Sequence, residues 1–271
     1  MLCAGYHGRR RAPAIGRGSW MSVDDGGSRN LAWRLAEHLG QAIVTGRIPE
    51  GSLLPVESAL CTEYDVGRGA VREAIKILSA KGLVEPRPRR GTRVNESRRW
   101  NLLDPEVLGW MRGGAPRPAL LEQFLQVRKA IEPEAAALAA SCGDPDGIAR
   151  IRAAYRRMEA AAVGEDDPQA SDAAFHCEIL AASGNPFFAA LQPMVGSALS
   201  LSIRATNAAK GVEIADLEAH RGILDAIVQG RAPLARRRVR ELLDEVEVLI
   251  APAPAEPTAA PARGRRGTAS V

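Results

Sequence analysis

The segment formed by residues 54–94 constrains the fold more than any other part of the chain. Four of its apolar residues recur at helical spacing and predict the buried face of one helix, namely Val71, Ala74, Ile75 and Leu78. Three basic residues recur four apart on another face, which should stay in water: Arg68, Arg72 and Lys76. A shorter helix over residues 57–64 should bring Leu60 to the same core, with Gly67 in the turn between the two helices. The segment therefore predicts a helix-turn-helix.

A basic hairpin should follow the second helix. Gly82 is placed to end that helix, and short strands are predicted over residues 83–86 and 92–95. The tip between the strands contains Arg87, Arg89, Arg90 and Gly91. A basic tip with a glycine can reach a phosphate backbone or a minor groove. We therefore predict a winged helix-turn-helix with a small β-hairpin wing, and double-stranded DNA as its partner.

This segment resembles the GntR family of bacterial transcription regulators. The matching residues are Gly46, Ile48, Pro49, Gly51, Leu54, Pro55, Glu57, Leu60, Val66, Arg68, the run 71–75, Leu78, Gly82 and Gly91. The resemblance implies a DNA-binding surface made of Arg68, Gly69, Arg72, Arg89, Arg90, Gly91 and Thr92. The chain departs from the family at Gly67 and Gly69, where Ser or Thr is usual, and at Ser58, where Arg is usual. Contacts to phosphate or base at those positions should therefore differ.

Composition agrees with a soluble helical protein of two domains. The chain has 271 residues, of which 46% are hydrophobic, 25% charged and only 4% aromatic, which favours helix over sheet. It contains no apolar run long enough to span a membrane. Its four cysteines lie far apart in the sequence and should be reduced and mostly buried, as in a cytoplasmic protein: Cys3, Cys61, Cys142 and Cys177.

The ends of the chain carry no helical pattern. Residues 1–28 should form a disordered basic arm without the apolar run of a signal peptide, and Met21 is an alternative start of translation to Met1. The DNA-binding domain is predicted over residues 29–96, and it begins with a helix whose buried stripe is Leu31, Leu35, Leu39 and Ile43. Residues 251–271 are rich in Pro and Arg and should form a disordered tail.

A linker is predicted over residues 97–118. Asp104 before Pro105 predicts a helix start, because Asp caps helices and Pro favours the first position. Four apolar residues should dock one domain on the other: Trp100, Leu103, Leu108 and Trp110. The stretch also resembles a tryptophan-containing linker of GntR regulators that respond to sugar acids.

Residues 119–250 are almost entirely helical in pattern and predict an antiparallel bundle. The first helix should bury a stripe made of Leu120, Phe124, Val127, Ile131 and Leu138. The second should begin at Asp144-Pro145, and four more are predicted over residues 168–182, 187–208, 214–229 and 233–250. The fold class is therefore mainly α.

This half resembles the FCD ligand-binding domain of the FadR subfamily of GntR regulators. The matching residues are Arg128, Glu132, the run 172–176, Ser183-Gly184-Asn185, the run 218–221, Ile227 and Gly230. The resemblance implies that a small molecule binds inside the bundle and controls DNA binding.

A divalent metal site is one interpretation of three residues in this bundle. Asp172 and His176 lie four apart and share a helix face, and His220 falls on the inward face of its helix. Such donors suit zinc, nickel or manganese. Hydrogen-bonded core residues are the alternative interpretation. The family has a histidine as fourth ligand in the last helix, whereas this chain has Leu242, so three protein groups would act with water or the effector.

An acidic effector would require a cation. Arg128 and Arg204 are the candidates, since guanidinium binds a carboxylate in bidentate fashion, and Asn185 is a further candidate contact. Arg128 could equally form an ion pair with Glu132. The linker resemblance makes an aldonate such as galactonate the first candidate among small hydroxy or sugar acids, with a fatty acyl group or another carboxylate as alternatives. The charge run at 236–240 should be a solvated face.

Two functions are consistent with these features. The first is a repressor or activator, with a repressor expected, that binds a palindromic operator as a homodimer and responds to a small carboxylic acid. The second is a metal-dependent hydrolase with a nucleic-acid-binding domain, since three ligands and an open position also suit catalysis. The sequence contains no HExxH motif or nucleophile elbow, and no glutamate beside the DxxFH run offers a general base, so we expect the regulator and not an enzyme.

Overall fold

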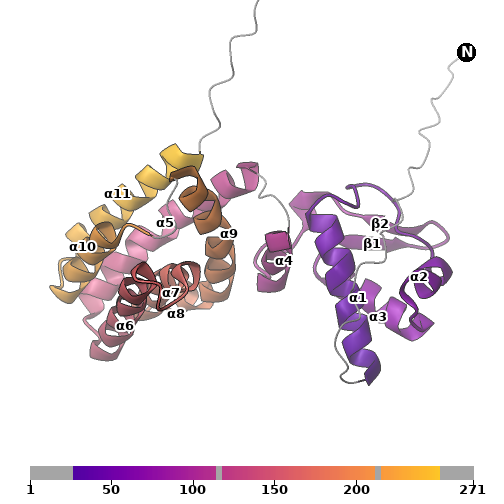
Figure 1. Cartoon of the computed structure of the whole chain (residues 1–271), viewed down its shortest axis with the longest axis horizontal. Helices are drawn as coiled ribbons and strands as arrows, with labels where there is room; N and C mark the ends of the chain where they lie inside the picture. Colours follow the sequence, from indigo (N-terminus) through magenta and orange to yellow (C-terminus); the bar gives the residue numbers. More distant parts are fainter. Residues whose placement is uncertain (1–26, 114–117, 211–214, 251–271) are drawn as a thin grey trace, which may run out of the picture.

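Figure 1 shows a computed structural model of the chain, which describes residues 27–113, 118–210 and 215–250. A winged helix-turn-helix lobe and a larger helical lobe lie side by side, with the short helix α4 (Pro105–Trp110) between them. Almost all of the predicted arm and tail, residues 1–26 and 251–271, falls outside the described residues. No helix in the described part is long and apolar enough to cross a membrane.

The first lobe is built around the contact between α1 (Gly27–Val44) and α3 (Arg68–Ala80). Leu35, Leu39 and Ile43 of α1 are fully buried, as are Val71 and Leu78 of α3. The helix α2 (Glu57–Tyr64) adds Leu60 to this core. Each such side chain contributes about 1.5–3 kcal/mol through burial. The predicted apolar faces are therefore confirmed.

Gly67 lies in the turn between α2 and α3, as predicted, and it is the capping residue of α3. Gly67 caps α3 with an ordinary extended backbone, φ −69°, whereas the left-handed residue of the turn is Asp65, φ 51°. Asp tolerates this conformation better than most residues, because its short polar side chain can bond locally. The backbone at Gly67 therefore does not require glycine, and a Cβ there would meet no other atom within 4 Å.

The wing is a two-stranded antiparallel sheet of β1 (Val84–Arg87) and β2 (Gly91–Val94). The strands lie one residue from their predicted positions, and Arg87 pairs with Gly91 at the end of the ladder instead of lying in the tip. Gly91 has φ 82°, which favours glycine, so this residue lets the chain turn back into β2.

The linker is fixed to the DNA-binding lobe. Asp104 caps α4 by accepting the Glu106 N–H at 2.9 Å, as predicted. The ring of Trp110 fills the space that a Cβ at Gly40 would occupy, and Lys81 at the end of α3 donates to Asp104 at 2.6 Å. Leu103, predicted to dock, is instead 66% exposed. It lies in a turn closed by a hydrogen bond from its own N–H to the Asn101 side chain, which leaves it on the surface.

Seven helices make up the described part of the second lobe, and the most extensive contacts among them join α5 to α11 and α6 to α7. They are α5 (Pro118–Cys142), α6 (Pro145–Ala162), α7 (Pro168–Ala182), α8 (Pro186–Ala190), α9 (Gln192–Lys210), α10 (Leu217–Val228) and α11 (Ala232–Ile250). The prediction of a single helix over residues 187–208 is wrong, because this segment is divided into α8 and α9 at Leu191. Pro193 explains the division, since proline is tolerated in the first turn of a helix but breaks its interior.

The buried face of α5 is only partly the predicted one, because Leu120, Phe124 and Ile131 are half-buried against the core. Val127 is 42% exposed and Leu138 is 40% exposed, so these residues are not core. The helix buries Leu121, Leu125 and the charged pair Arg128 and Glu132 instead. The prediction was wrong because a charged pair that satisfies its own hydrogen bonds can replace apolar residues in a core.

Three of the four cysteines lie in the described part, and all three are free thiols. Cys61 and Cys177 are half-buried, whereas Cys142 is exposed, contrary to the expectation of mostly buried cysteines. Cys142 is the last residue of α5, where the helix leaves the bundle. Cys3 lies outside the described residues.

Candidate functional site

The predicted DNA-binding residues lie on the surface of the first lobe. Arg68, Gly69 and Arg72 are exposed on α3, and so are Arg89 and Arg90 at the wing tip. Gly91 is exposed as well, while Thr92 is half-buried in β2. The fold therefore brings the basic face of one helix and the basic hairpin into the same small lobe (Figure 1).

One of these arginines already has a partner. The Nε of Arg72 donates to Oε2 of Glu57 on α2 at 3.0 Å, and both side chains are largely exposed. An exposed ion pair of this kind is worth about 0–1 kcal/mol, so Arg72 can exchange Glu57 for a phosphate or a base edge at low cost. Arg87, by contrast, pairs with Glu85 on its own strand at 2.7 Å.

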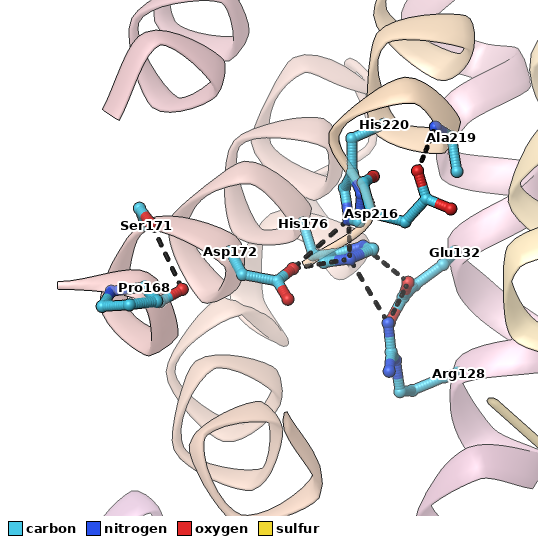
Figure 2. A network of polar contacts seen from close by, with 9 residues as sticks. All are labelled: Arg128, Glu132, Pro168, Ser171, Asp172, His176, Asp216, Ala219 and His220. Carbon is cyan, nitrogen blue, oxygen red and sulfur yellow. Dashed lines mark hydrogen bonds and ion pairs between the residues drawn. The ribbon is translucent and has the colours of Figure 1, made fainter. Parts of the chain in front are cut away.

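A second group of polar residues lies inside the helical lobe (Figure 2). Asp172 and His176 come from α7, His220 comes from α10, and Arg128 and Glu132 come from α5. All five side chains are buried, and none is more than 6% exposed. The separate predictions for Asp172, His176, His220 and Arg128 thus converge on one place.

Three ligand atoms point to a common centre. His176 Nε2 lies 3.3 Å from Asp172 Oδ1, His220 Nε2 lies 3.4 Å from the same oxygen, and the two Nε2 atoms are 3.4 Å apart. A tetrahedral metal bound at about 2.1 Å holds its ligands about 3.4 Å from one another. The spacing of the three atoms therefore fits three corners of a tetrahedral site.

The partners of the histidines set their tautomers. His176 Nδ1 is 3.0 Å from Oε2 of Glu132, and His220 Nδ1 is 2.6 Å from the Asp216 carbonyl oxygen. Because both partners are acceptors, each Nδ1 donates, and in a neutral ring this leaves the Nε2 lone pair aimed at the centre. Oδ1 of Asp172 is buried without a hydrogen-bond donor. Three acceptors thus converge, and this arrangement favours a cation among them.

The electrostatics of the group are dominated by its own charges. Burial raises the pKa of Glu132, but Arg128 and His176 outweigh this effect and hold the pKa at about 2. Burial lowers the pKa of His176, but Glu132 and Asp172 outweigh it and raise that pKa to about 9. Burial also opposes ionisation of Asp172, yet the two histidines lower its pKa. The carboxylates are therefore charged, and a metal would compete with a proton for His176.

A cavity of about 40 Å³ opens beside these atoms. Arg128 lines it, and so do Ser202 of α9 and Leu242 of α11, the position at which the family resemblance implied a fourth ligand. The space holds roughly three waters. The guanidinium of Arg128 uses Nε and Nη2 to bind Glu132 at 2.6 and 3.2 Å, which leaves further N–H donors for a ligand in the cavity.

Of the other predicted effector contacts, Asn185 does not join this site. The Asn185 side chain accepts the Phe187 N–H at 2.9 Å and caps α8, and Asn185 does not line the cavity. Arg204 belongs to α9, but its side chain lies outside the described residues. The charge run on α11 was predicted to be a solvated face, but it is only partly solvated. Arg236 in this run donates two hydrogen bonds to Glu134 of α5, each 2.7 Å long.

Sequence reasoning missed three contributors to the site. Glu132 was interpreted only as a partner of Arg128, although its spacing of four residues from Arg128 was visible. The carbonyl of Asp216 and the hydroxyl of Ser202 gave no such signal, because a backbone atom and a serine in an apolar stretch are not recognisable as ligand contacts from sequence.

Comparison with known proteins agrees with this arrangement of two domains. The model of bacterial regulatory proteins of the gntR family matches residues 31–94, and the model of the FCD domain matches residues 123–245. The HTH-type transcriptional regulator YieP of Escherichia coli K12 is 37% identical over 222 residues, which are 79% of this chain and 93% of that relative. The chain belongs to the GntR family of transcription regulators, in the FadR-like subfamily with an FCD domain.

Two further proteins are informative. The galactonate operon transcriptional repressor of Escherichia coli K12 is 30% identical over 199 residues, which cover 73% of this chain and 87% of the repressor. The solved structure of Lar from Listeria monocytogenes, which controls expression of the agr system there, has a TM-score of 0.60 at 16% identity. It covers 84% of this chain and 98% of Lar, and it shows the fold alone. The family consists of DNA-binding regulators and not of enzymes, and its FCD domain implies a small-molecule effector.

Proposed function

We propose that this GntR regulator binds a palindromic operator as a homodimer and represses a catabolic operon until a small hydroxy or sugar acid enters its FCD domain. The observation that carries the proposal is the buried triangle of Asp172, His176 and His220 beside a cavity that also contains Arg128. A divalent metal on the first three residues would supply positive charge at one side of the cavity, and Arg128 supplies it at the other. An acid is the ligand that both charges favour.

Leu242 suits a metal that leaves a position open for the effector. An apolar side chain at this point cannot coordinate, so the three protein ligands leave room for oxygen atoms from outside. A 2-hydroxy acid offers a carboxylate and a neighbouring hydroxyl. The relative that represses the galactonate operon makes an aldonate the first candidate.

The small size of the cavity favours a change in packing when the acid binds. About 40 Å³ accommodates the carboxylate end of an acid, while the rest of an aldonate would need α9 or α11 to shift. Leu199 and Ser202 of α9 line this cavity, whereas Met194 and Leu201 of the same helix line a hollow shared with α4. A shift of α9 would thus be passed to α4, which Lys81 ties to the end of α3.

Nothing at the site favours the hydrolase alternative. Glu132 is the only glutamate beside the metal-binding residues in the described part, and it is held by Arg128 and His176 with a low pKa. A carboxylate with both oxygens engaged in this way is a poor general base.

The proposal is tested by metal analysis and thermal shift on the purified full chain. Chelated protein is loaded with zinc, nickel or manganese and screened against galactonate, other aldonates, lactate and fatty acyl thioesters. A true effector in hundredfold excess over its dissociation constant should stabilise the protein by roughly 2.7 kcal/mol, and only when metal is present.

Two variants make the result specific. Asp172→Asn keeps the size of the side chain but weakens the metal ligand, and it should lose both metal and the acid-induced shift. Asp225→Asn makes the same change at an exposed position of α10 that does not line the cavity, and it should behave as wild type. A wild-type chain that binds no metal and responds to none of the acids would contradict the proposal.

A further inference from the structure

We infer that a hollow between α6 and α10 binds a small hydroxylated compound through its phosphate group. The two helices contact each other, and the hollow that they line has a volume of about 300 Å³. This volume lies at the lower end of the usual range for small-molecule sites. The hollow is separate from the cavity beside the histidines, because no described residue lines both spaces.

Three arginines give the hollow its positive charge. Arg152 and Arg156 are exposed and lie one turn apart on α6, and Arg221 is exposed on α10. Neither Arg152 nor Arg156 has an ion-pair partner in the described part of the chain, and Arg221 lies 4.0 Å from Asp225, at the limit of an ion pair. Like charges one turn apart on a helix destabilise it. An anion held between these side chains would therefore remove an unfavourable interaction.

The other arginines of α6 behave differently. Arg150 pairs with Glu178 of α7 at 3.2 Å, and Arg157 pairs with Asp166 at 2.9 Å. Both of them satisfy their charge within the chain, whereas the two arginines at the hollow do not. In the DNA-binding domain, the predicted DNA contact Arg68 also has no ion-pair partner among the described residues. Arginines without a partner inside the chain are the ones available to a phosphate from outside.

A phosphate group fits the lining better than a single carboxylate does. A phosphate monoester carries about two negative charges at neutral pH and three acceptor oxygens, and guanidinium groups bind such oxygens in pairs. Two carboxylates also line the hollow, Glu159 of α6 and Asp225 of α10. They would repel a bare anion, but they accept hydrogen bonds from hydroxyl groups. The lining therefore favours a compound that has hydroxyl groups beside its phosphate, such as a sugar phosphate.

The apolar lining of the hollow is held in place by the fold. Tyr155 is 7% exposed, and its hydroxyl donates to the carbonyl oxygen of Leu217 on α10 at 3.3 Å. Its ring packs edge-on against that of Phe175, with 6.3 Å between the ring centroids. Leu224 of α10 is buried as well and also lines the hollow. Because these side chains are fixed by contacts within the chain, little ordering is needed when a ligand binds.

The test is calorimetric titration of the full chain with glucose 6-phosphate, glycerol 3-phosphate and inorganic phosphate, and with glucose as the uncharged probe. The two phosphate esters should bind, inorganic phosphate should bind more weakly, and glucose should not bind. A double variant, Arg152→Gln with Arg156→Gln, should bind the esters about ten- to a hundredfold more weakly, because it loses hydrogen bonds from charged donors. Arg231→Gln is the control, since Arg231 is exposed and does not line the hollow, and it should bind as wild type does.

A further variant separates an ester site from an ion site. Glu159→Gln removes a repelling charge and a hydroxyl acceptor, so it should strengthen the binding of inorganic phosphate and weaken that of glucose 6-phosphate. Circular dichroism should show that all variants stay folded, because every substituted side chain is exposed. Phosphate bound by arginines of the DNA-binding domain is common to all variants, so the difference between wild type and the double variant reports the hollow.

Three results would overturn the inference. The first is a wild-type chain that binds neither ester at millimolar concentration. The second is a double variant that binds the esters as tightly as wild type does. The third is a double variant that loses operator affinity when no phosphate compound is present, which would assign these arginines to DNA. Asp172→Asn should bind the esters as wild type does, so failure of the proposed acid-binding site would leave this inference intact.

Discussion

The candidate sites of the two domains keep their charged side chains in opposite places. In the DNA-binding domain, Arg68, Arg72 and Lys76 are exposed, and the partners they have are on the surface. In the FCD domain, Arg128 and Glu132 are buried in a closed network. Exposed charges can exchange partners at little cost, whereas buried charges need every partner in place. Substitution of the exposed arginines should therefore change DNA binding with little change in stability, whereas substitution of the buried charges should also change stability.

The largest expected effect is the loss of Arg128. Arg128→Ala leaves Glu132 buried beside His176 without its guanidinium partner. Removal of one member of a buried pair costs about 3–5 kcal/mol, and chemical denaturation should show a loss of that size. A loss below about 1 kcal/mol would mean that the pair is not buried in solution.

Arg72 should show the opposite behaviour. Arg72→Ala removes an exposed side chain at the start of the recognition helix and should cost about 1–3 kcal/mol of operator affinity if it reads a base edge. The denaturation midpoint should hardly move. Arg156→Ala, an exposed arginine on α6, is the matched control and should leave operator affinity intact. Equal affinities for Arg72→Ala and wild type would remove Arg72 from the interface.

A polar group added to the core of the FCD domain tests whether the buried site can use a further ligand. Leu242→His places an imidazole on the wall of the cavity beside Asp172, His176 and His220, where it would offer a fourth ligand to a metal. Metal affinity, measured by competition with a chelator, should rise by about tenfold or more. Residues that only hydrogen-bond to a metal ligand already change the affinity by about tenfold, and a direct ligand should do at least as much. An unchanged affinity would mean that the Leu242 position does not face the metal.

The smallest effect is expected at Lys76. Its ion pair with Glu73 is exposed and three residues apart on α3, so Lys76→Ala should change stability by less than about 0.5 kcal/mol. Thermal unfolding measures this directly. A cost comparable to that of Arg128→Ala would contradict the division between exposed and buried charges.

The same contrast explains which features could be predicted from sequence. The basic face of α3 and its apolar face were predicted because an amphipathic helix shows both in one periodic pattern. The buried stripe of α5 was predicted one residue away from its true place, because Arg128 and Glu132 look like surface residues until His176 is known to lie beside them. Asp172, His176 and His220 could be grouped because charged or imidazole side chains on inward faces are rare.

The central claim is that the buried group in the FCD domain controls the DNA-binding domain. The most direct test is to measure the operator affinity of the metal-loaded chain with and without the acid that stabilises it. The measurement is made for wild type and for Asp172→Asn. In wild type the acid should weaken binding to an operator selected in vitro by roughly 5–150-fold, the usual range of such coupling. Asp172→Asn should bind the operator as wild type does without acid, and acid should then have no effect. An Asp172→Asn chain that releases the operator at the wild-type acid concentration would contradict the account.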